Sequence, residues 1–340
     1  MRAVAIAGKK QLSVVETETP KPDGKNVIIK ISQVGICGSD LHIWANGDRP
    51  GLVMGHEFAG TVADPGALKD TLKVGDRVTA LPINPCGECP PCKSGHFNMC
   101  AHGLDAAPGI TSPGAYAEYF VSRPDMVRKL PDTVSDSEAA MIEPTGVALR
   151  AVRLAGVKPG DKVLVTGGGI IGLLCANWAK IAGASYVAMT EINQLRSDNA
   201  LKMGDVDKVF DGKDEKLVPK LIQASGGGFD QALECTAIAA AVNNSIMSLK
   251  SGGKLMIVGV NFSLVPVSTL WILLHELEVK GTIAYTEEFD ISLDLMSKKI
   301  IATQRFVSAT VGLDGVQGAF ERLTSGTNSD VKILIKPQVA

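Results

Sequence analysis

A glycine-rich segment in the middle of the chain constrains the fold more than any other feature of the sequence. The apolar run Val163 to Val165 is followed by residues 167–172, which read Gly-Gly-Gly-Ile-Ile-Gly. This is the pattern G-x-G-x-x-G, placed directly after a predicted strand. Gly167 would allow a tight turn, Gly169 would let the backbone approach a pyrophosphate, and Gly172 would let a helix pack closely on the strand. The segment therefore predicts a strand–turn–helix unit that binds a dinucleotide.

Strands and helices alternate from about residue 145 onward. Helical patterns fill residues 147–155, 172–182 and 239–249, and strand candidates lie at residues 162–166, 186–191, 208–210, 229–234, 254–260 and 278–284. Alternation at this spacing predicts a parallel, doubly wound sheet of the Rossmann type.

The first 145 residues have a different character. Gly and Pro alternate with short β-type runs at residues 26–31, 57–62, 77–80 and 117–121, which is typical of an irregular, mainly β domain. The alternating pattern stops near Tyr285, and the tail ends in a predicted strand. Because 340 residues are too many for one ordinary core, we expect an α/β protein with two domains. They are a catalytic domain of residues 1–145 and 286–340, and a dinucleotide-binding domain of residues 146–285.

Composition argues against some classes of partner. The chain has 34 basic and 36 acidic residues and a net charge of −2, so nothing favours nucleic acid or an anionic membrane as a partner. The most apolar stretch, Leu264 to Leu277, contains Pro266 and is too short to span a bilayer. The first residues lack the long apolar run of a signal peptide. We expect a cytoplasmic protein that acts on a small molecule.

The cofactor preference depends on the end of the next predicted strand, at Glu191. A carboxylate there can accept hydrogen bonds from the adenosine ribose and would repel a 2′-phosphate, which favours NAD over NADP. Glu191 could instead cap the following helix. Arg196 is a candidate to pack over the adenine, or else a solvated helix charge, and Ile171 inside the glycine pattern is counted with the cofactor residues.

Four of the seven cysteines lie within 15 residues, as Cys86-x2-Cys89-x2-Cys92-x7-Cys100. Such clustering in a cysteine-poor chain favours reduced thiols that hold a metal. Four thiolates with no position left for water describe a closed, structural zinc site. An iron–sulfur cluster is the rival, but nothing nearby suggests electron transfer.

A second set of metal-ligand types is dispersed. Cys37 follows one predicted strand, and His56 and Glu57 begin another. Thiolate, imidazole and carboxylate are all competent zinc ligands, although any one of them alone is more often a structural residue.

With these motifs, the sequence resembles the zinc-dependent medium-chain dehydrogenases, in particular the branch of sorbitol, other polyol and threonine dehydrogenases. The motifs that carry the resemblance are Gly-Ile-Cys-Gly-Ser-Asp-Leu-His at 35–42, Gly-His-Glu at 55–57, the four-cysteine loop, Glu143-Pro144, Lys158-Pro159-Gly160-Asp161 and the glycine pattern. They occur in the family's order and span almost the whole chain. The resemblance implies a GroES-like catalytic domain, one catalytic and one structural zinc ion, and NAD.

The resemblance also implies the ligands of the catalytic zinc. Cys37 and His56 would bind it, and Glu57 and Glu143 would touch it directly or stand beside it. Asp40 would orient the His56 ring, unless it is an ordinary helix-cap aspartate.

The same resemblance implies a proton relay. Zinc as a Lewis acid would lower the pKa of a bound alcohol. Ser39 would take the hydroxyl proton and pass it, through the cofactor ribose, to His42 and solvent. Hydride would then move between a secondary alcohol (a polyol, cyclitol, sugar or similar compound) and NAD, giving a ketone.

The substrate is less constrained than the reaction. Only 18 residues, 38 to 55, separate Cys37 from His56, fewer than the resemblance leads us to expect, and Trp44 and Asp48 in that segment would line the substrate cleft. Ala284-Tyr285 stands where polyol dehydrogenases tend to have Arg-Tyr. Threonine or 2,3-butanediol-type dehydrogenation is the alternative, and a zinc-free NADPH-dependent reductase or a dinucleotide sensor without catalysis is a weaker one.

A homodimer or homotetramer is expected. Residues 271–279 are apolar and β-prone, and they predict either a subunit interface at a sheet edge or a buried internal strand.

Overall fold

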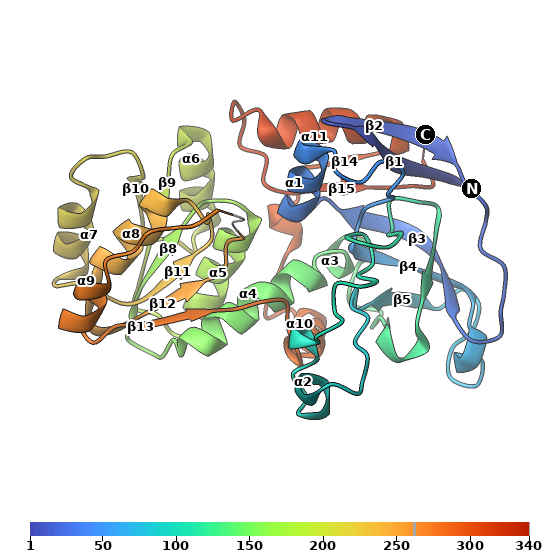
Figure 1. Cartoon of the computed structure of the whole chain (residues 1–340), viewed down its shortest axis with the longest axis horizontal. Coiled ribbons are helices and arrows are strands. Elements are labelled where there is room, and N and C mark those ends of the chain that lie inside the picture. Colours follow the sequence, from blue (N-terminus) through green and yellow to red (C-terminus); the bar gives the residue numbers. More distant parts are fainter. Residues whose placement is uncertain (261–262, 340) are drawn as a thin grey trace. The chain divides into compact units, whose positions relative to one another are not determined.

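The computed structural model describes residues 1–260 and 263–339 (Figure 1). The chain forms two compact units. Unit 1 contains Met1–Glu143, Phe289–Gly326 and Lys332–Ala340, and unit 2 contains Pro144–Glu288 and Thr327–Val331. The short return of residues 327–331 to unit 2 has no counterpart in the boundaries expected from the sequence.

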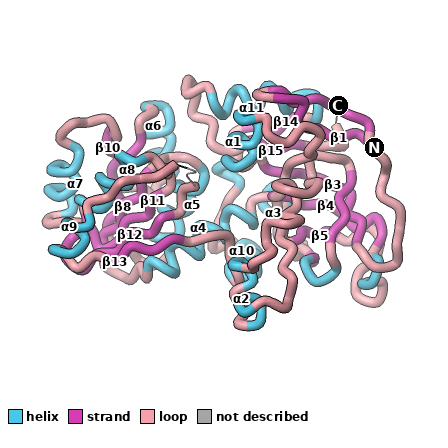
Figure 2. Tube along the Cα trace, viewed as in Figure 1, coloured by secondary structure: helices cyan, strands magenta, loops and turns pink. Residues whose placement is uncertain are grey.

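Unit 2 is built on a six-stranded parallel sheet (Figure 2, magenta). The strands are β8 (Lys162–Thr166), β9 (Tyr186–Glu191), β10 (Lys208–Asp211), β11 (Phe229–Glu234), β12 (Leu249–Ile257) and β13 (Glu278–Gly281). Their order is β10-β9-β8-β11-β12-β13, with every neighbouring pair parallel. The chain therefore runs outward from β8 in one direction and then outward from β11 in the other. This confirms the doubly wound sheet, whose switch point lies between β8 and β11.

Helices connect these strands because each parallel crossover needs a connection over a face of the sheet. They are α5 (Ile170–Ile181), α6 (Gln194–Met203), α7 (Leu217–Ser225), α8 (Ala239–Met247) and α9 (Thr269–Leu274), and helix α4 (Ile142–Ala155) leads into the first strand, β8. In the core, Leu221 of α7 and Val242 of α8 pack with Leu164, Phe229 and Leu255 of the sheet.

The expected strand at residues 271–279 is wrong in part. Residues 271–274 are the end of helix α9, and only the later residues belong to strand β13. That strand pairs with β12 on one side and is exposed, so it is an edge strand and not a buried internal one. A short apolar run does not distinguish a helix turn from a strand.

Unit 1 contains a seven-stranded sheet and a two-stranded one. The larger has the order β14-β15-β3-β4-β5-β7, with β6 also paired to β3, and β1 pairs with β2. The strands are β1 (Arg2–Gly8), β2 (Gln11–Glu16), β3 (Val27–Gly35), β4 (Glu57–Asp64), β5 (Arg77–Ala80), β6 (Tyr119–Ser122), β7 (Val127–Lys129), β14 (Ala309–Val311) and β15 (Ile333–Ile335). The helices are α1 (Gly38–Asn46), α2 (Pro90–Lys93), α3 (Asp136–Ala139), α10 (Glu288–Ser297) and α11 (Val316–Thr324).

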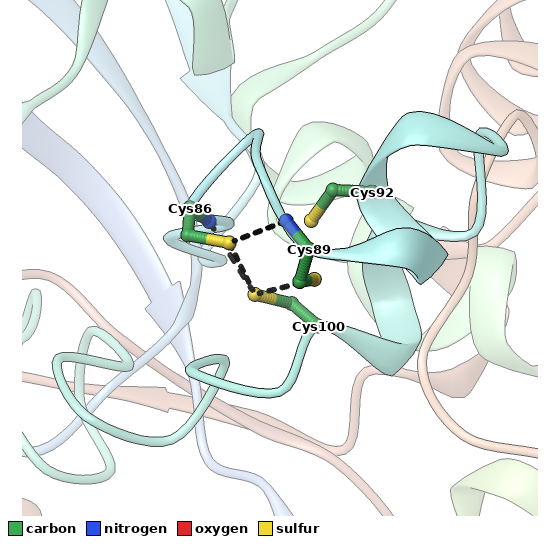
Figure 3. Close-up of side chains that lie close together, drawn as sticks. All are labelled: Cys86, Cys89, Cys92 and Cys100. Atoms are coloured by element: carbon green, nitrogen blue, oxygen red, sulfur yellow. Dashed lines mark hydrogen bonds between the residues drawn. The ribbon is translucent and has the colours of Figure 1, made fainter.

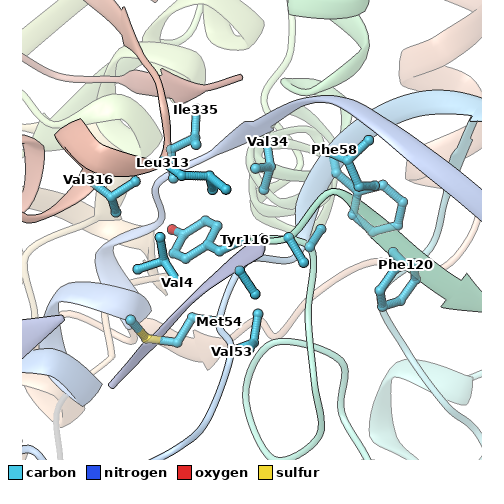
Figure 4. Packing of buried hydrophobic residues seen from close by; sticks show 14 of the residues in the cluster. Val4, Val34, Val53, Met54, Phe58, Tyr116, Phe120, Leu313, Val316 and Ile335 are labelled. Carbon is cyan, nitrogen blue, oxygen red and sulfur yellow. The ribbon is translucent and has the colours of Figure 1, made fainter. Parts of the chain in front are cut away.

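The core of unit 1 joins the first part of the chain to its last. Figure 4 shows Tyr116 and Val4 beside Leu313, Val316 and Ile335, all of which are buried. The C-terminal segment therefore belongs to the same hydrophobic core as the N-terminal strands, since its apolar side chains fill the space over β1 and β3.

Trp44 belongs to this core as well. It is 3% exposed, and its ring meets that of Phe320 edge-on with 5.6 Å between centroids. The expectation that Trp44 lines a substrate cleft is therefore wrong, because burying the indole in the core is worth more than leaving it in contact with solvent. Asp48 is exposed.

Among the described residues, no helix combines the length and apolar character needed to cross a bilayer.

Candidate metal and dinucleotide sites

The four clustered cysteines converge on one point (Figure 3). Cys86 and Cys89 precede helix α2, Cys92 lies in it, and Cys100 follows it. Their sulfur atoms all lie within 4.8 Å of one another. Cys86 and Cys100 have sulfurs 3.6 Å apart, and Cys89 and Cys100 have sulfurs 3.9 Å apart. A tetrahedron with zinc–sulfur bonds of about 2.3 Å has edges of about 3.8 Å. The spacing thus fits a single tetrahedral ion and leaves no room for an iron–sulfur cluster.

Backbone amides surround these sulfurs. Cys86 Sγ accepts hydrogen bonds from the N–H groups of Glu88 and Cys89, at 3.5 and 3.4 Å. Backbone N–H groups of Ala101 and Cys92 lower the pKa of the Cys89 thiol to about 6, whereas burial raises the pKa of Cys92 to about 12. Donors around a sulfur favour the thiolate form, which is the form that binds metal.

The second group lies where two antiparallel strands meet. Strands β3 and β4 pair so that Gly35 is opposite Glu57. Cys37 follows the end of β3, and His56 precedes β4, so this register brings together residues that are far apart in sequence. The ligand atoms of Cys37, His56 and Glu57 lie within 4.8 Å of one another.

Asp40 is held between a helix terminus and the imidazole. Its Oδ2 accepts hydrogen bonds from the Cys37 N–H (2.9 Å) and the Tyr116 hydroxyl (2.6 Å). Its Oδ1 lies 3.7 Å from His56 Nδ1. Asp40 is therefore both the capping aspartate of α1 and a neighbour of the imidazole, and with Nδ1 facing Asp40, the Nε2 atom of His56 is left for a metal.

The buried ionisable groups around His56 influence one another's pKa values. Burial lowers the pKa of His56, but negative charge on Cys37 and Asp40 raises it by more, so it lies well above its ordinary value. Burial has the opposite effect on the Asp40 carboxyl, whose pKa it raises. A metal binds the neutral imidazole, so zinc and a proton would compete for His56. A doubly charged cation would also neutralise the negative charge of Cys37 and Asp40.

Glu143 lies in the first turn of α4 and within electrostatic reach of this group. Burial is the main cause that raises the pKa of its carboxyl to about 7; Glu57 and Asp40 add to this, while His56 and Lys332 oppose it. In the described part of the chain, Glu143 is not among the residues whose ligand atoms gather within 4.8 Å.

The relay candidates lie on helix α1. The Ser39 hydroxyl is buried and has no hydrogen-bond partner among the described residues, which leaves it available to a substrate hydroxyl. His42 is exposed and lies three residues further on, so both side chains are on the same side of the helix.

The glycine pattern forms the turn between β8 and α5. Gly167 has φ of +93°, which favours glycine. A Cβ on Gly172 would lie 1.9 Å from the Gly167 carbonyl oxygen, whereas a Cβ on Gly169 would meet no atom within 4 Å. The loop therefore packs tightly at Gly172 and is open at Gly169, where α5 begins and its N–H groups can face an anion.

Glu191 ends β9 and lies against this loop. Its Oε2 accepts the Gly168 N–H at 2.7 Å, and its Oε1 accepts the N–H groups of Ile192 (2.7 Å) and Asn193 (2.9 Å). Ile171 and Arg196 are half-buried, in the first turns of α5 and α6.

Two residues of the metal region were not predicted from the sequence. Tyr116 gave no signal, because an aromatic residue in a β-rich domain is usually a core residue. Lys332 gave a weak one, because it is a charged residue within an apolar run, Val331 to Ile335.

Both units match families of known dehydrogenases. Residues 23–132 match the alcohol dehydrogenase GroES-like domain, and residues 171–298 match the zinc-binding dehydrogenase family. Sorbitol dehydrogenase of Bacillus subtilis (strain 168) is 31% identical over 346 residues, which cover 99% of this chain and 97% of that protein. The chain belongs to the zinc-dependent medium-chain dehydrogenases. The expected family and GroES-like domain are confirmed.

Other members of this family are similar to a comparable degree. (R,R)-Butanediol dehydrogenase of Bacillus subtilis (strain 168) is 32% identical over 356 residues, covering 99% of this chain and all of that one. A solved structure from Sinorhizobium meliloti 1021, described as a zinc-binding dehydrogenase bound to NADP, has a TM-score of 0.89 at 29% identity and covers 99% of each chain.

Two glycines of the loop are expected to respond differently to substitution by alanine. Gly172→Ala should lower the free energy of unfolding of unit 2 by about 1–3 kcal/mol or more, because its Cβ has no space. Gly169→Ala should unfold at the wild-type temperature but bind NAD about tenfold more weakly or worse, since the methyl group would occupy the place of the pyrophosphate. Thermal unfolding and NAD titration of both variants check this. Wild-type NAD affinity in Gly169→Ala would contradict the loop assignment.

Proposed function

We propose that this protein oxidises a secondary alcohol of the polyol class to a ketone with NAD, using a zinc ion held by Cys37 and His56 with Glu57 and Glu143 beside it. The convergence of thiolate, imidazole and carboxylate within 4.8 Å carries this proposal. A zinc site whose protein ligands leave a position for substrate is the catalytic type. The four-cysteine group would hold a second, structural zinc ion.

The chain's own residues supply orientation and proton transfer. Asp40, itself fixed by Tyr116, faces Nδ1 of His56 and would leave Nε2 to hold the metal. The Ser39 hydroxyl would accept the proton of the substrate hydroxyl while it gives up its own, and His42 would take up a proton and release one to solvent. A zinc ion in this site is a Lewis acid that lowers the pKa of an alcohol. The nicotinamide ring supplies the hydride chemistry.

NAD is favoured over NADP by Glu191. The carboxylate lies against the glycine loop, where a 2′-phosphate would meet its negative charge. One similar solved structure is bound to NADP, so activity with NAD and with NADP has to be compared. Glu191 is the residue on which the preference would depend.

The substrate class is supported by the relatives that are named for sorbitol and for butanediol. Both compounds carry vicinal hydroxyl groups, and oxidation of one of them gives a ketone. Acyclic polyols and vicinal diols are therefore the first candidates, with cyclitols, sugars and threonine as the alternatives. The cytoplasmic location expected from the sequence stays a prediction.

We also propose that two copies associate through the edge of the unit 2 sheet. Strand β13 is an exposed edge, and edge strands readily pair with another chain. Large apolar side chains are exposed close to it in sequence: Leu264, Leu270, Leu273, Leu274, Val279 and Ile283. Such a concentration of exposed apolar residues is typical of an interface between subunits.

An assay of NADH formation at mildly alkaline pH tests the proposed reaction. The panel consists of polyols, vicinal diols, cyclitols, sugars and threonine, each with NAD and with NADP. Turnover should appear with NAD on one of these groups and disappear after chelation, and Cys37→Ser should lose nearly all of it. Turnover that survives removal of all zinc, or that requires NADP and an enone, would instead support the zinc-free reductase.

The same assay tests the relay. Ser39→Ala and His42→Ala should each reduce kcat by about 10²–10⁴-fold, the usual size of a general acid–base contribution. His102→Ala, at an exposed histidine two residues after Cys100, is the matched control and should keep wild-type kcat. Full turnover in both relay variants would overturn the assignment while leaving the zinc chemistry in place.

Association is tested by light scattering. The wild-type protein should have the mass of a dimer or tetramer, and the double variant Leu270→Asp/Leu273→Asp should be a monomer, because it places charges on the proposed interface. Leu201→Asp, at another exposed leucine, should keep the wild-type mass. A monomeric wild type would contradict the proposal.

A further inference from the structure

A single buried lysine contacts both segments that carry the metal-ligand candidates. Lys332 is 0% exposed, and its Nζ donates a hydrogen bond to the Ile36 carbonyl oxygen at 2.9 Å. The same Nζ forms an ion pair with Oε2 of Glu57, which is 1% exposed. Ile36 precedes Cys37, and Glu57 follows His56. The ammonium group therefore links the two ends of the candidate site.

The backbone at Gly35 leaves the space that the Lys332–Glu57 pair occupies. A Cβ on Gly35 would lie 2.4 Å from Glu57 Oε2 and 2.9 Å from Lys332 Cε. Gly35 pairs with Leu334 of β15 on one side and with Glu57 of β4 on the other. Only glycine at this position leaves the space in which the lysine and the carboxylate meet.

Burying a lysine and a glutamate together is costly, because both lose their hydration. A lysine that only filled space in the core could be replaced by an apolar residue at lower cost. The pair includes Glu57, one of the three residues that converge, so Lys332 contacts the group that would hold the metal.

We propose that Lys332 is a positioning residue that holds the Glu57 carboxylate by one oxygen and so keeps it from closing the coordination of the catalytic metal. This inference rests on the proposed function and deepens it. With Oε2 engaged by the ammonium, Glu57 cannot offer both oxygens to the ion, and the positive charge of Lys332 weakens it as a donor. The position that a substrate hydroxyl needs therefore stays accessible.

The lysine and the glutamate should behave as a coupled pair. Without Lys332, Glu57 would be an unpaired anion beside a cation and would become a full ligand. Zinc would then bind more tightly and the substrate would have to displace a carboxylate. Removing the charge of Glu57 at the same time should cancel both effects, since contacting residues are not additive.

The experiment compares Lys332→Met, Lys332→Arg and Lys332→Met/Glu57→Gln with the full-length wild type. We measure zinc affinity by competition with a chromophoric chelator, the visible absorption of the cobalt-substituted protein, and kcat. Lys332→Met should bind the catalytic zinc more tightly, show a changed cobalt spectrum and lose about 10–100-fold in kcat, the usual cost in activity of removing a partner of a metal ligand. Lys332→Arg should resemble the wild type, and the double variant should regain the wild-type zinc affinity.

Two reference variants complete the design. Cys37→Ser reports zinc bound to the four-cysteine loop alone, and Lys336→Met, an exposed lysine on the same segment, should match the wild type in every readout. If Lys332→Met fails to fold, the double variant, which leaves no buried carboxylate unpaired, still gives the comparison with the wild type.

The outcomes separate the two proposals. Weaker zinc binding or an unchanged cobalt spectrum in Lys332→Met would overturn the role of Lys332, as would a double variant that differs from the wild type in zinc affinity or cobalt spectrum. If the wild type binds no more zinc than Cys37→Ser, the catalytic zinc site itself is wrong and the role of Lys332 falls with it. The metal readouts need no substrate, so an error in the substrate class leaves them intact.

Discussion

The antiparallel pairing of β3 with β4 is the constraint on which the candidate metal site depends. The register that sets Gly35 opposite Glu57 places one potential ligand just beyond the end of one strand and two at the start of the next. A shift of one residue would turn every side chain of the strand to the opposite face and would separate Cys37 from His56. The register is specified by the buried side chains of β3, among them Ile29, Ile31 and Val34, and by β15, which pairs with the other edge of β3.

The C-terminal segment, which returns to unit 1, contacts both β3 and the residues of the candidate site. The last strand, β15, completes the sheet beside β3, and the residue before it, Lys332, reaches between the two ligand-bearing segments. Tyr116 does the equivalent on the other side, where it fixes Asp40 against His56. These groups engage one oxygen of each carboxylate, Oδ2 of Asp40 and Oε2 of Glu57. What remains free is the capacity that a metal and a substrate would use, notably the Ser39 hydroxyl.

The sequence was most informative where burial produces a strong pattern. All six strands of unit 2 were predicted. Strands β8, β9 and β11 are almost wholly buried and read as apolar runs, and the glycine pattern marks the first turn. Unit 1 was harder. Strand β2 is largely exposed and β7 has only three residues, and helix α1 begins with Gly-Ser-Asp, which reads as a turn. The Lys332–Glu57 pair joins residues 275 positions apart, and no local pattern can predict such a partner. Trp44 was misplaced because it lies in helix α1, which was not predicted, and on the face of that helix that packs against the core.

Anomalous diffraction at the zinc absorption edge, on crystals of protein expressed with zinc, tests the central claim most directly. We predict two peaks, one among Cys86, Cys89, Cys92 and Cys100 and one between Cys37 and His56. A single peak at the four-cysteine loop would contradict the account, because Cys37 and His56 would then bind no zinc.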